Sequence, residues 1–342
     1  MSLLEPAPLT MLAAVLDNGP QGIEVRSVPV PDVQPGHVRV RIEAAALNRR
    51  DVWISQGLYA GIVYPSVLGS DGAGVIDSVG EGVSRDLLGM HVVINPSMNW
   101  GESSRAQSND YSILGMPSQG TFAEYVVVPA HQCHALPGHL TMVQGAAVPL
   151  AGLTAYRAVV TQGNVLQGQH VLVTGAGGGV SSWAIRFARV FGATVNVTTR
   201  NETTLQAALD SGAHGGMCVG QQGWTKQYAA RFGAPDCIID SIGGEFMNHL
   251  VNLCAPGGTI VSYGATLGTV PGFELRRVFW KQLRLIGSTM GSNEEFARMM
   301  ECVDVHKIVP LIDSVRPLSE ISGAFERMLS NEHAGKIVLR IR

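Results

Sequence analysis

Hydrophobic and polar residues alternate in the first part of the chain, which is the period of a β-strand with one face toward water. The clearest case is residues 37–45, HVRVRIEAA, where Val and Ile alternate with Arg and Glu. Further strand-like runs, separated by Gly and Pro turns, lie at 73–79, 91–94 and 124–128. The pattern predicts a β-rich domain over residues 11–150.

From about residue 151 the pattern changes to short apolar runs that alternate with helical patterns. The predicted strands lie near 171–174, 194–198, 216–219, 236–240, 258–263 and 283–287. This alternation predicts a parallel doubly wound sheet in an α/β protein. Six strands with helical crossovers match the dinucleotide-binding, Rossmann version of that sheet, which we expect over residues 151–290.

The last part of the chain, 291–342, has helical patterns at 293–302 and 318–329 and ends in a strand-like run, GKIVLRI. We expect this strand to return to the first domain and complete it.

Composition narrows the class of protein. With 342 residues, of which 46% are hydrophobic, the chain can bury more than one core. A net charge of −3 and the lack of any Lys/Arg block argue against a nucleic-acid partner. No apolar run approaches the ~20 residues of a membrane span, and the first ten residues, MSLLEPAPLT, do not resemble a signal peptide. The expectation is a cytoplasmic protein without membrane or nucleic-acid partners.

The stretch VTGAGGGVSS, 173–182, predicts a strand that turns sharply into a helix. Free backbone amides and the positive end of the helix dipole at such a turn bind phosphate, so we expect a pyrophosphate there. The alternative is a tight turn without ligand, because the strict G-x-G-x-x-G fails at Val180 and is restored only in a frame ending at Ser182. The predicted contacts are Gly175, Gly177, Gly178, Gly179, Val180 and Ser181.

The end of the second strand indicates which nicotinamide cofactor binds. An acidic residue there would bind the ribose of NAD, whereas Thr198, Thr199 and Arg200 occupy the place. Hydroxyls and a guanidinium suit a 2′-phosphate, so NADP(H) is predicted. The alternative is a solvated Arg200 with Glu202 in the acidic role.

Taken together, the chain resembles a medium-chain dehydrogenase/reductase, on the zinc-independent, quinone-reductase-like side of that superfamily. The matching stretches are LNRRDVWISQG (47–57), PSVLGSDGAGVIDSVGEGV (65–83), QGTFAEYVVVPA (119–130), AAVPLAGLTAYRAV (146–159), VLVTGAGGGVSSWAIRFARVFGATV (171–195) and AGKIVLRI (334–341). The resemblance implies a GroES-like catalytic domain (1–150, completed by 291–342), a Rossmann cofactor domain (151–290), an active site in the cleft between them, and a homodimer or homotetramer joined through 261–288.

The zinc ligands of the family's alcohol dehydrogenases are missing at the matching places. Asn48 replaces the cysteine of the C-x-x-D segment, Ser70 replaces the histidine of the Gly-His-Glu segment, and PLAGLTAY offers neither thiolate nor imidazole. Residues 95–118, where the structural zinc would lie, contain no cysteine. His131 and His134 lack a third ligand in evident reach. We therefore expect no metal.

Without zinc to polarise a carbonyl, a conjugated enone or a quinone is the easier hydride acceptor, because its negative charge spreads and hydrogen-bond donors can stabilise it. Asn48 is the first candidate donor, followed by Ser70 and by Arg50 if that side chain turns inward rather than lying on the surface. An apolar wall for a ring is predicted from Trp53, Tyr59 and Tyr64, each of which could equally be core packing.

Further cofactor contacts are expected at the carboxyl ends of the parallel strands, where this fold binds ligands. Thr154 and Tyr156 match positions that line the cofactor in relatives. The candidates after the later strands are Ser241, Tyr263, Gly264, Ser288 and Thr289.

The sequence thus predicts an NADPH-dependent reductase of a small electrophilic substrate, a quinone or an α,β-unsaturated carbonyl. The alternatives are an alcohol dehydrogenase or carbonyl reductase of the same superfamily, and an NADPH-binding protein with little turnover.

Overall fold

A computed structural model describes residues 9–18 and 22–342 of the chain. It forms two compact units: the first takes the residues up to Leu150, Gly291–Asn331 and Lys336–Arg342, and the second takes Ala151–Met290 with Glu332–Gly335. Residues 1–8, most of the stretch tested for a signal peptide, lie outside the described residues.

The first unit is built on a seven-stranded sheet in the order β10-β6-β5-β3-β18-β17, with β9 paired to β3. The strands are β3 (His37–Ala46), β5 (Asp71–Val79), β6 (His91–Ile94), β9 (Tyr125–Pro129), β10 (Cys133–Ala135), β17 (Ile312–Pro317) and β18 (Lys336–Arg340). The β-rich pattern is confirmed to within two residues at each predicted strand, and β18 does return to the first unit, antiparallel to β3.

Smaller elements complete this unit. Two further sheets contain β1 (Thr10–Leu16), β2 (Ile23–Pro29) and β4 (Ser66–Val67), and β7 (Ser97–Met98) with β8 (Ser112–Ile113). Its helices are α1 (Arg49–Ser55), α2 (Met142–Ala146), α9 (Asn293–Val305) and α10 (Ile321–Leu329), with 3₁₀ turns at Arg85–Leu87, Ala130–Gln132 and Leu318–Glu320. The alternating apolar residues of β3 lie in the core, fully buried.

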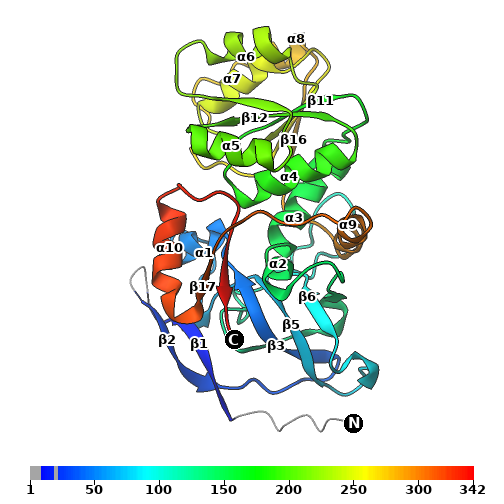
Figure 1. Ribbon diagram of the computed structural model, residues 1–342, viewed down its shortest axis with the longest axis vertical. Helices are drawn as coiled ribbons and strands as arrows, with labels where there is room; N and C mark the ends of the chain where they lie inside the picture. Colours follow the sequence, from blue (N-terminus) through cyan, green and yellow to red (C-terminus); the bar gives the residue numbers. More distant parts are fainter. Residues whose placement is uncertain (1–8, 19–21) are drawn as a thin grey trace. The chain divides into compact units, whose positions relative to one another are not determined.

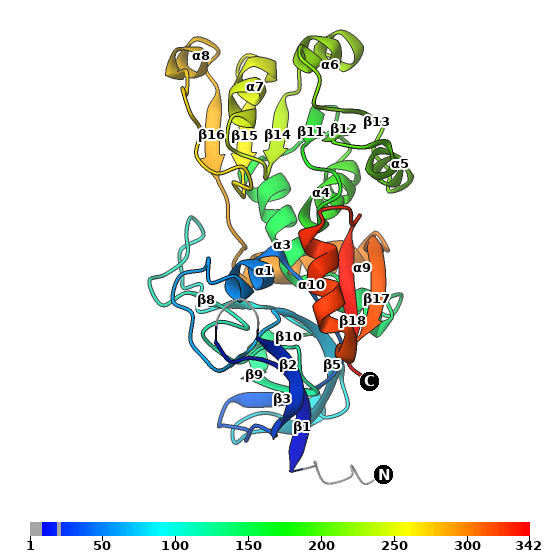
Figure 2. The same ribbon diagram turned by 90° about the vertical axis from the view of Figure 1, so that its left-hand side faces the viewer.

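The second unit has one parallel six-stranded sheet in the order β13-β12-β11-β14-β15-β16, whose strands fan out side by side in Figure 2. They are β11 (His170–Val173), β12 (Thr194–Thr199), β13 (Gly215–Cys218), β14 (Cys237–Asp240), β15 (Thr259–Ser262) and β16 (Arg284–Gly287). All six predicted strands are confirmed, and the order is that of a dinucleotide-binding sheet.

Helices cover both faces of this sheet, as Figure 1 shows, with α4 and α5 on one face and α6 and α7 on the other. The second unit begins within α3 (Pro149–Tyr156), which a π-helical turn, Arg157–Gln162, follows. The remaining helices are α4 (Gly179–Val190), α5 (Glu202–Asp210), α6 (Trp224–Phe232), α7 (Phe246–Leu253) and α8 (Leu275–Trp280).

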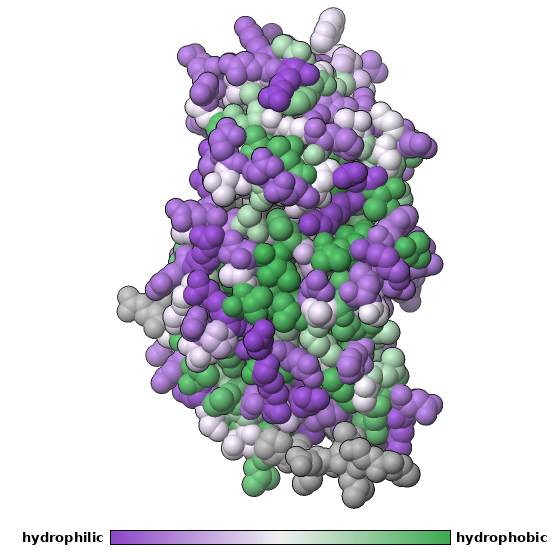
Figure 3. Space-filling view, viewed as in Figure 1, coloured by the Kyte–Doolittle hydropathy of each residue, from purple (hydrophilic) through white to green (hydrophobic). Residues whose placement is uncertain are grey.

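Hydrophilic side chains cover much of the face visible in Figure 3. In the described part of the chain, the helices are all too short or too polar to cross a bilayer.

Candidate functional site

The glycine-rich turn after β11 leaves backbone amides for a ligand. Gly175 has a φ of +62°, a conformation that side chains disfavour. Gly178 caps α4 and has no side chain to bond its first turn, so the amides of Gly179, Val180 and Ser181 have no acceptor within the helix. Amides at the positive end of a twelve-residue helix suit a phosphate group.

Gly177 is required by close packing. A Cβ at this position would lie 3.0 Å from Thr204 Cγ2 and 3.1 Å from His333 O. The amide of Gly335 also donates to Gly177 O at 3.0 Å. The segment 332–335 therefore lies directly on the turn and supports it from behind.

Beneath the turn, the buried carboxylate of Asp240 ties β11 to β14. It accepts hydrogen bonds from Thr174 Oγ1 at 2.6 Å, Ile242 N at 3.2 Å and Gly243 N at 3.1 Å. Burial raises the pKa of Asp240 above its ordinary value, while these hydrogen bonds oppose the rise. The sheet order reverses between these two strands, which is where such sheets bind ligands. Sequence reasoning missed Asp240, which ends a strand as an ordinary acidic residue.

Several predicted cofactor residues meet at this edge. Tyr263 OH and Ser181 Oγ lie 3.1 Å apart, a Cβ on Gly175 would be 3.5 Å from Ser241 Oγ, and one on Gly264 would be 3.2 Å from Ser241 O. Burial raises the pKa of Tyr263, which keeps the phenol protonated.

The residues predicted to select the cofactor follow β12. Thr198 O accepts from Ala176 N at 3.1 Å, which sets this strand end beside the turn. Thr199 is buried, whereas Arg200 is exposed and precedes Asn201, whose side chain caps α5. The guanidinium is therefore accessible to a ligand held at the turn.

At the end of β16, Ser288 Oγ is buried and has no hydrogen-bond partner in the described chain. Thr289 is exposed, and Thr154 Oγ1 lies 3.6 Å from Met290 Sδ. An orphaned buried hydroxyl at the carboxyl end of the sheet, together with the open amides of α4, fits a dinucleotide.

In the first unit, Asn48 lies at the centre of a buried polar network. Its Nδ2 donates to Asp71 Oδ2 at 2.9 Å, and its Oδ1 accepts from Lys336 Nζ at 2.7 Å. Lys336 also lies 2.8 Å from Asp71 Oδ2, and Leu150 N donates to Asp71 Oδ1 at 2.7 Å. Lys336 escaped the sequence analysis, although a lysine directly before the apolar run IVL in GKIVLRI was a signal.

Arg50 and Ser70 come together beside this network. Arg50 is only 6% exposed, so the surface alternative was wrong. Its Nη1 donates to Ser70 Oγ at 2.7 Å and to Leu114 O at 3.0 Å, while Nε and Nη2 are buried without a partner in the described residues. Ser70 Oγ donates to Leu114 O at 2.8 Å, so its single hydrogen is engaged.

The three predicted wall residues lie in different surroundings. Tyr59 stacks on Arg50, with 5.1 Å from the guanidinium carbon to the ring centre. Trp53 and Tyr64 are 37% and 38% exposed. Burial raises the pKa of Tyr111, which sequence reasoning did not single out, to about 12, while the charge of Arg50 opposes the rise. The phenol of Tyr111 therefore stays protonated at neutral pH.

Comparisons with known proteins match two separate parts of the chain to known families. Residues 34–138 match the alcohol dehydrogenase GroES-like domain, and 179–304 match the zinc-binding dehydrogenase family. A zinc-type alcohol dehydrogenase-like protein, YogA of Leptosphaeria maculans, is 34% identical over 94% of this chain and 95% of its own length. The chain belongs to the medium-chain dehydrogenase/reductase superfamily. It is an oxidoreductase of that superfamily.

Two other relatives show how broad this medium-chain dehydrogenase/reductase superfamily is. The human quinone oxidoreductase is 28% identical, with 94% of each chain covered. A crystal structure described as an NAD-dependent alcohol dehydrogenase superposes with a TM-score of 0.92 at 35% identity, covering 97% of this chain and all of that one.

Zinc, which the family names imply, does not fit the donors of this medium-chain dehydrogenase/reductase. Asn48 and Ser70 replace strong ligands, and both oxygens of Asp71 are occupied, one of them by the Lys336 ammonium. Within residues 9–18 and 22–342, groups of three or more His, Cys, Asp or Glu suited to a metal are absent. His131 is exposed and His134 half-buried.

The buried carboxyl of Asp51 accepts a hydrogen bond at Oδ2 from the backbone amide of Asn48, at 2.8 Å. Burial raises the pKa of Asp51 from 3.8 to about 6, although the charge of Arg50 opposes the rise. Protonation of Asp51 therefore stabilises the folded state. This stabilisation is fully present below about pH 4 and is lost as the pH rises through about 6.

Asp51→Asn should remove this pH dependence. The oxygen of the new side chain can still accept from the backbone amide of Asn48, but a carboxamide does not titrate. Between pH 5 and pH 7.5 the unchanged protein should lose about 1.4 kcal/mol more unfolding free energy than the variant. Urea denaturation at the two pH values measures the difference. Parallel losses in the two proteins would contradict the raised pKa.

Proposed function

We propose that this medium-chain dehydrogenase/reductase uses NADPH to reduce quinones or α,β-unsaturated carbonyl compounds without a catalytic metal. The observation that carries the proposal is the replacement of metal ligands by neutral hydrogen-bonding groups beside a buried guanidinium. Asn48 and Ser70 lie buried at the positions that match the thiolate and imidazole of the family's zinc proteins, and the buried Arg50 donates to Ser70.

These donors suit a charge that spreads over a conjugated system. One hydrogen of Asn48 Nδ2 bonds Asp71, which leaves the second for a substrate oxygen. Arg50 contributes N–H groups that have no partner in the described chain. Ser70 anchors Arg50 in this proposal rather than donating to the substrate. Donors aimed at one oxygen stabilise an enolate or a hydroquinone anion as it forms.

When bound, the nicotinamide supplies the hydride. The residues that would hold it are the turn amides of 178–181, the orphaned Ser288 hydroxyl and the residues around Tyr263. NADPH is favoured by the exposed guanidinium of Arg200 next to Thr199, since a carboxylate at that place would repel a 2′-phosphate. The quinone oxidoreductase relatives support the choice of substrate.

The direct test follows NADPH oxidation by 1,4-benzoquinone, 9,10-phenanthrenequinone and 3-penten-2-one, with the zinc content of the protein measured in parallel. Turnover without bound zinc is expected. Stoichiometric zinc with chelator-sensitive alcohol oxidation would instead support an alcohol dehydrogenase, and NADPH binding without any turnover would support a binding protein.

Asn48→Ala should lower kcat on these acceptors by about 100-fold, the usual cost of one oxyanion donor. NADPH affinity, measured by fluorescence, should be unchanged because Asn48 lies in the first unit and the turn in the second. A kcat equal to that of the unchanged protein would remove Asn48 from the mechanism.

Arg200→Ala should weaken NADPH binding by about tenfold, the loss of one charge-assisted contact, and leave NADH binding nearly unchanged. Lys226→Ala is the matched control, because Lys226 is an exposed cation on α6 of the same unit. Fluorescence titration with both cofactors measures the ratio. Equal losses for NADPH and NADH would refute the role given to Arg200.

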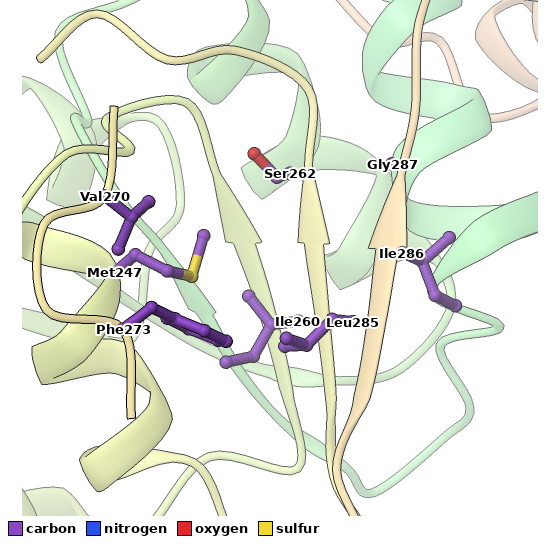
Figure 4. Close-up of a pocket in the computed structure, with 8 residues that line it drawn as sticks. All are labelled: Met247, Ile260, Ser262, Val270, Phe273, Leu285, Ile286 and Gly287. Carbon is purple, nitrogen blue, oxygen red and sulfur yellow. The ribbon is translucent and has the colours of Figure 1, made fainter. Parts of the chain in front are cut away.

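We also propose a homodimer or homotetramer joined through the second unit. The sheet ends at β16, whose outer edge has no strand in the described chain. Large apolar side chains are exposed on α8, the helix that precedes β16, with Leu275 at 64%, Phe279 at 62% and Trp280 at 83%. Beside them is an apolar pocket of about 440 Å³, in which Met247 and Phe273 face Ile260 and Leu285 (Figure 4). An open edge with such a surface favours a second copy.

Trp280→Asp should convert the oligomer to a monomer, because the interface would have to bury an unpaired carboxylate. Light scattering after size exclusion measures the mass, with Trp53→Asp as the control at an exposed tryptophan of the first unit. An unchanged oligomer in Trp280→Asp would place the interface elsewhere.

A further inference from the structure

The ammonium of Lys336 is buried in the first unit with an acceptor for each of its three hydrogens. Lys336 is 3% exposed, and Nζ donates to Leu47 O at 2.7 Å, Asn48 Oδ1 at 2.7 Å and Asp71 Oδ2 at 2.8 Å. Lysine is almost never fully buried unless it is paired. Holding a lysine here costs desolvation energy that an apolar pair would avoid, so the charge itself calls for an explanation.

The contacts of Asn48 determine which way its amide points. An ammonium can only donate and a carboxylate can only accept. Oδ1 must therefore face Lys336 and Nδ2 must face Asp71. One hydrogen remains on Nδ2, for which the residues described by the structure provide no further acceptor.

The positive charge of Lys336 also polarises this amide, because Nζ donates directly to Oδ1. A cation on the amide oxygen draws electron density away from the nitrogen, and hydrogen bonds in a chain strengthen one another in a low-dielectric interior. The remaining Nδ2 hydrogen then becomes a better donor. Asp71 balances the charge while the substrate oxygen is neutral.

We propose that Lys336 is a positioning residue that acts through Asn48: it fixes the amide and supplies the positive charge that stabilises negative charge forming on the substrate oxygen. This inference rests on the proposed function. It assigns to an internal lysine part of the electrostatic effect that a metal provides in other members of the superfamily.

The test uses full-length Lys336→Met and Lys336→Gln. Both should lower kcat on 3-penten-2-one by about 100-fold. The loss on 1,4-benzoquinone should be several-fold smaller, because the quinone spreads the charge itself. KM for NADPH should not change. Lys336→Gln keeps donors for Asn48 and Asp71, so it remains informative if Lys336→Met, which leaves Asp71 unpaired, does not fold.

Two comparisons separate positioning from a purely structural role. Arg39→Met breaks a half-buried ion pair with Asp77 in the same sheet, so it should reduce stability but leave kcat unchanged. Lys336→Gln combined with Asn48→Ala should be no slower than Asn48→Ala alone, since Lys336 acts through Asn48. Additive losses in the double variant, or equal losses on both acceptors, would overturn the proposal.

A third measurement does not depend on turnover. The side-chain amide proton signals of Asn48, assigned by their disappearance in Asn48→Ala, should move upfield in Lys336→Gln and stay in place in Arg39→Met. Signals that do not move in Lys336→Gln would refute the polarisation of Asn48. If the unchanged protein reduces none of the acceptors, the proposed function fails, and this measurement alone decides the role of Lys336.

Discussion

The first unit depends on one buried ion pair, Lys336 with Asp71. The two residues begin β18 and β5, and the lysine also bonds Leu47, which follows β3. Three strand ends that are far apart in the sequence therefore meet at one charge pair. Such a pair is stable only when every donor and acceptor is satisfied, and here further bonds from Asn48 and from the amide of Leu150 complete the set. The constraint leaves Asn48 little freedom, so the amide to which we assign a catalytic role is held by the groups that hold the strands.

The second unit uses a buried carboxylate in a similar way. Asp240 ends β14 and bonds the Thr174 hydroxyl after β11 as well as the amides of Ile242 and Gly243. It joins the two strands between which the sheet order reverses and so fixes the base of the glycine turn. In both units a buried acidic residue orders the loops that carry the candidate site, while the hydrophobic core determines the sheet.

The fold could be predicted from the sequence because the periodicity of apolar residues is visible within a short stretch of the chain. The alternation in 37–45 could be recognised directly, and its apolar residues are buried as expected. The hydroxyl of Ser181 bonds Thr174 O and Tyr263, so a cofactor contact of Ser181 stays a prediction for its backbone amide. The partners of Lys336 and Asp240 could not be predicted, since Asp71 and Thr174 lie more than 60 residues away in the sequence.

The arrangement around Asn48 also bears on which class of substrate the site would suit. Oxidation of an alcohol requires a group that takes the hydroxyl proton, and a metal assists by lowering the pKa of a bound hydroxyl. Asn48 cannot do this, because its amide oxygen already accepts from Lys336 and its nitrogen is not basic. The same amide can donate to an oxygen that gains charge, as the carbonyl of an enone does when hydride arrives. Under the proposed function, a fixed cation behind a neutral donor thus suits reduction of conjugated acceptors better than alcohol oxidation.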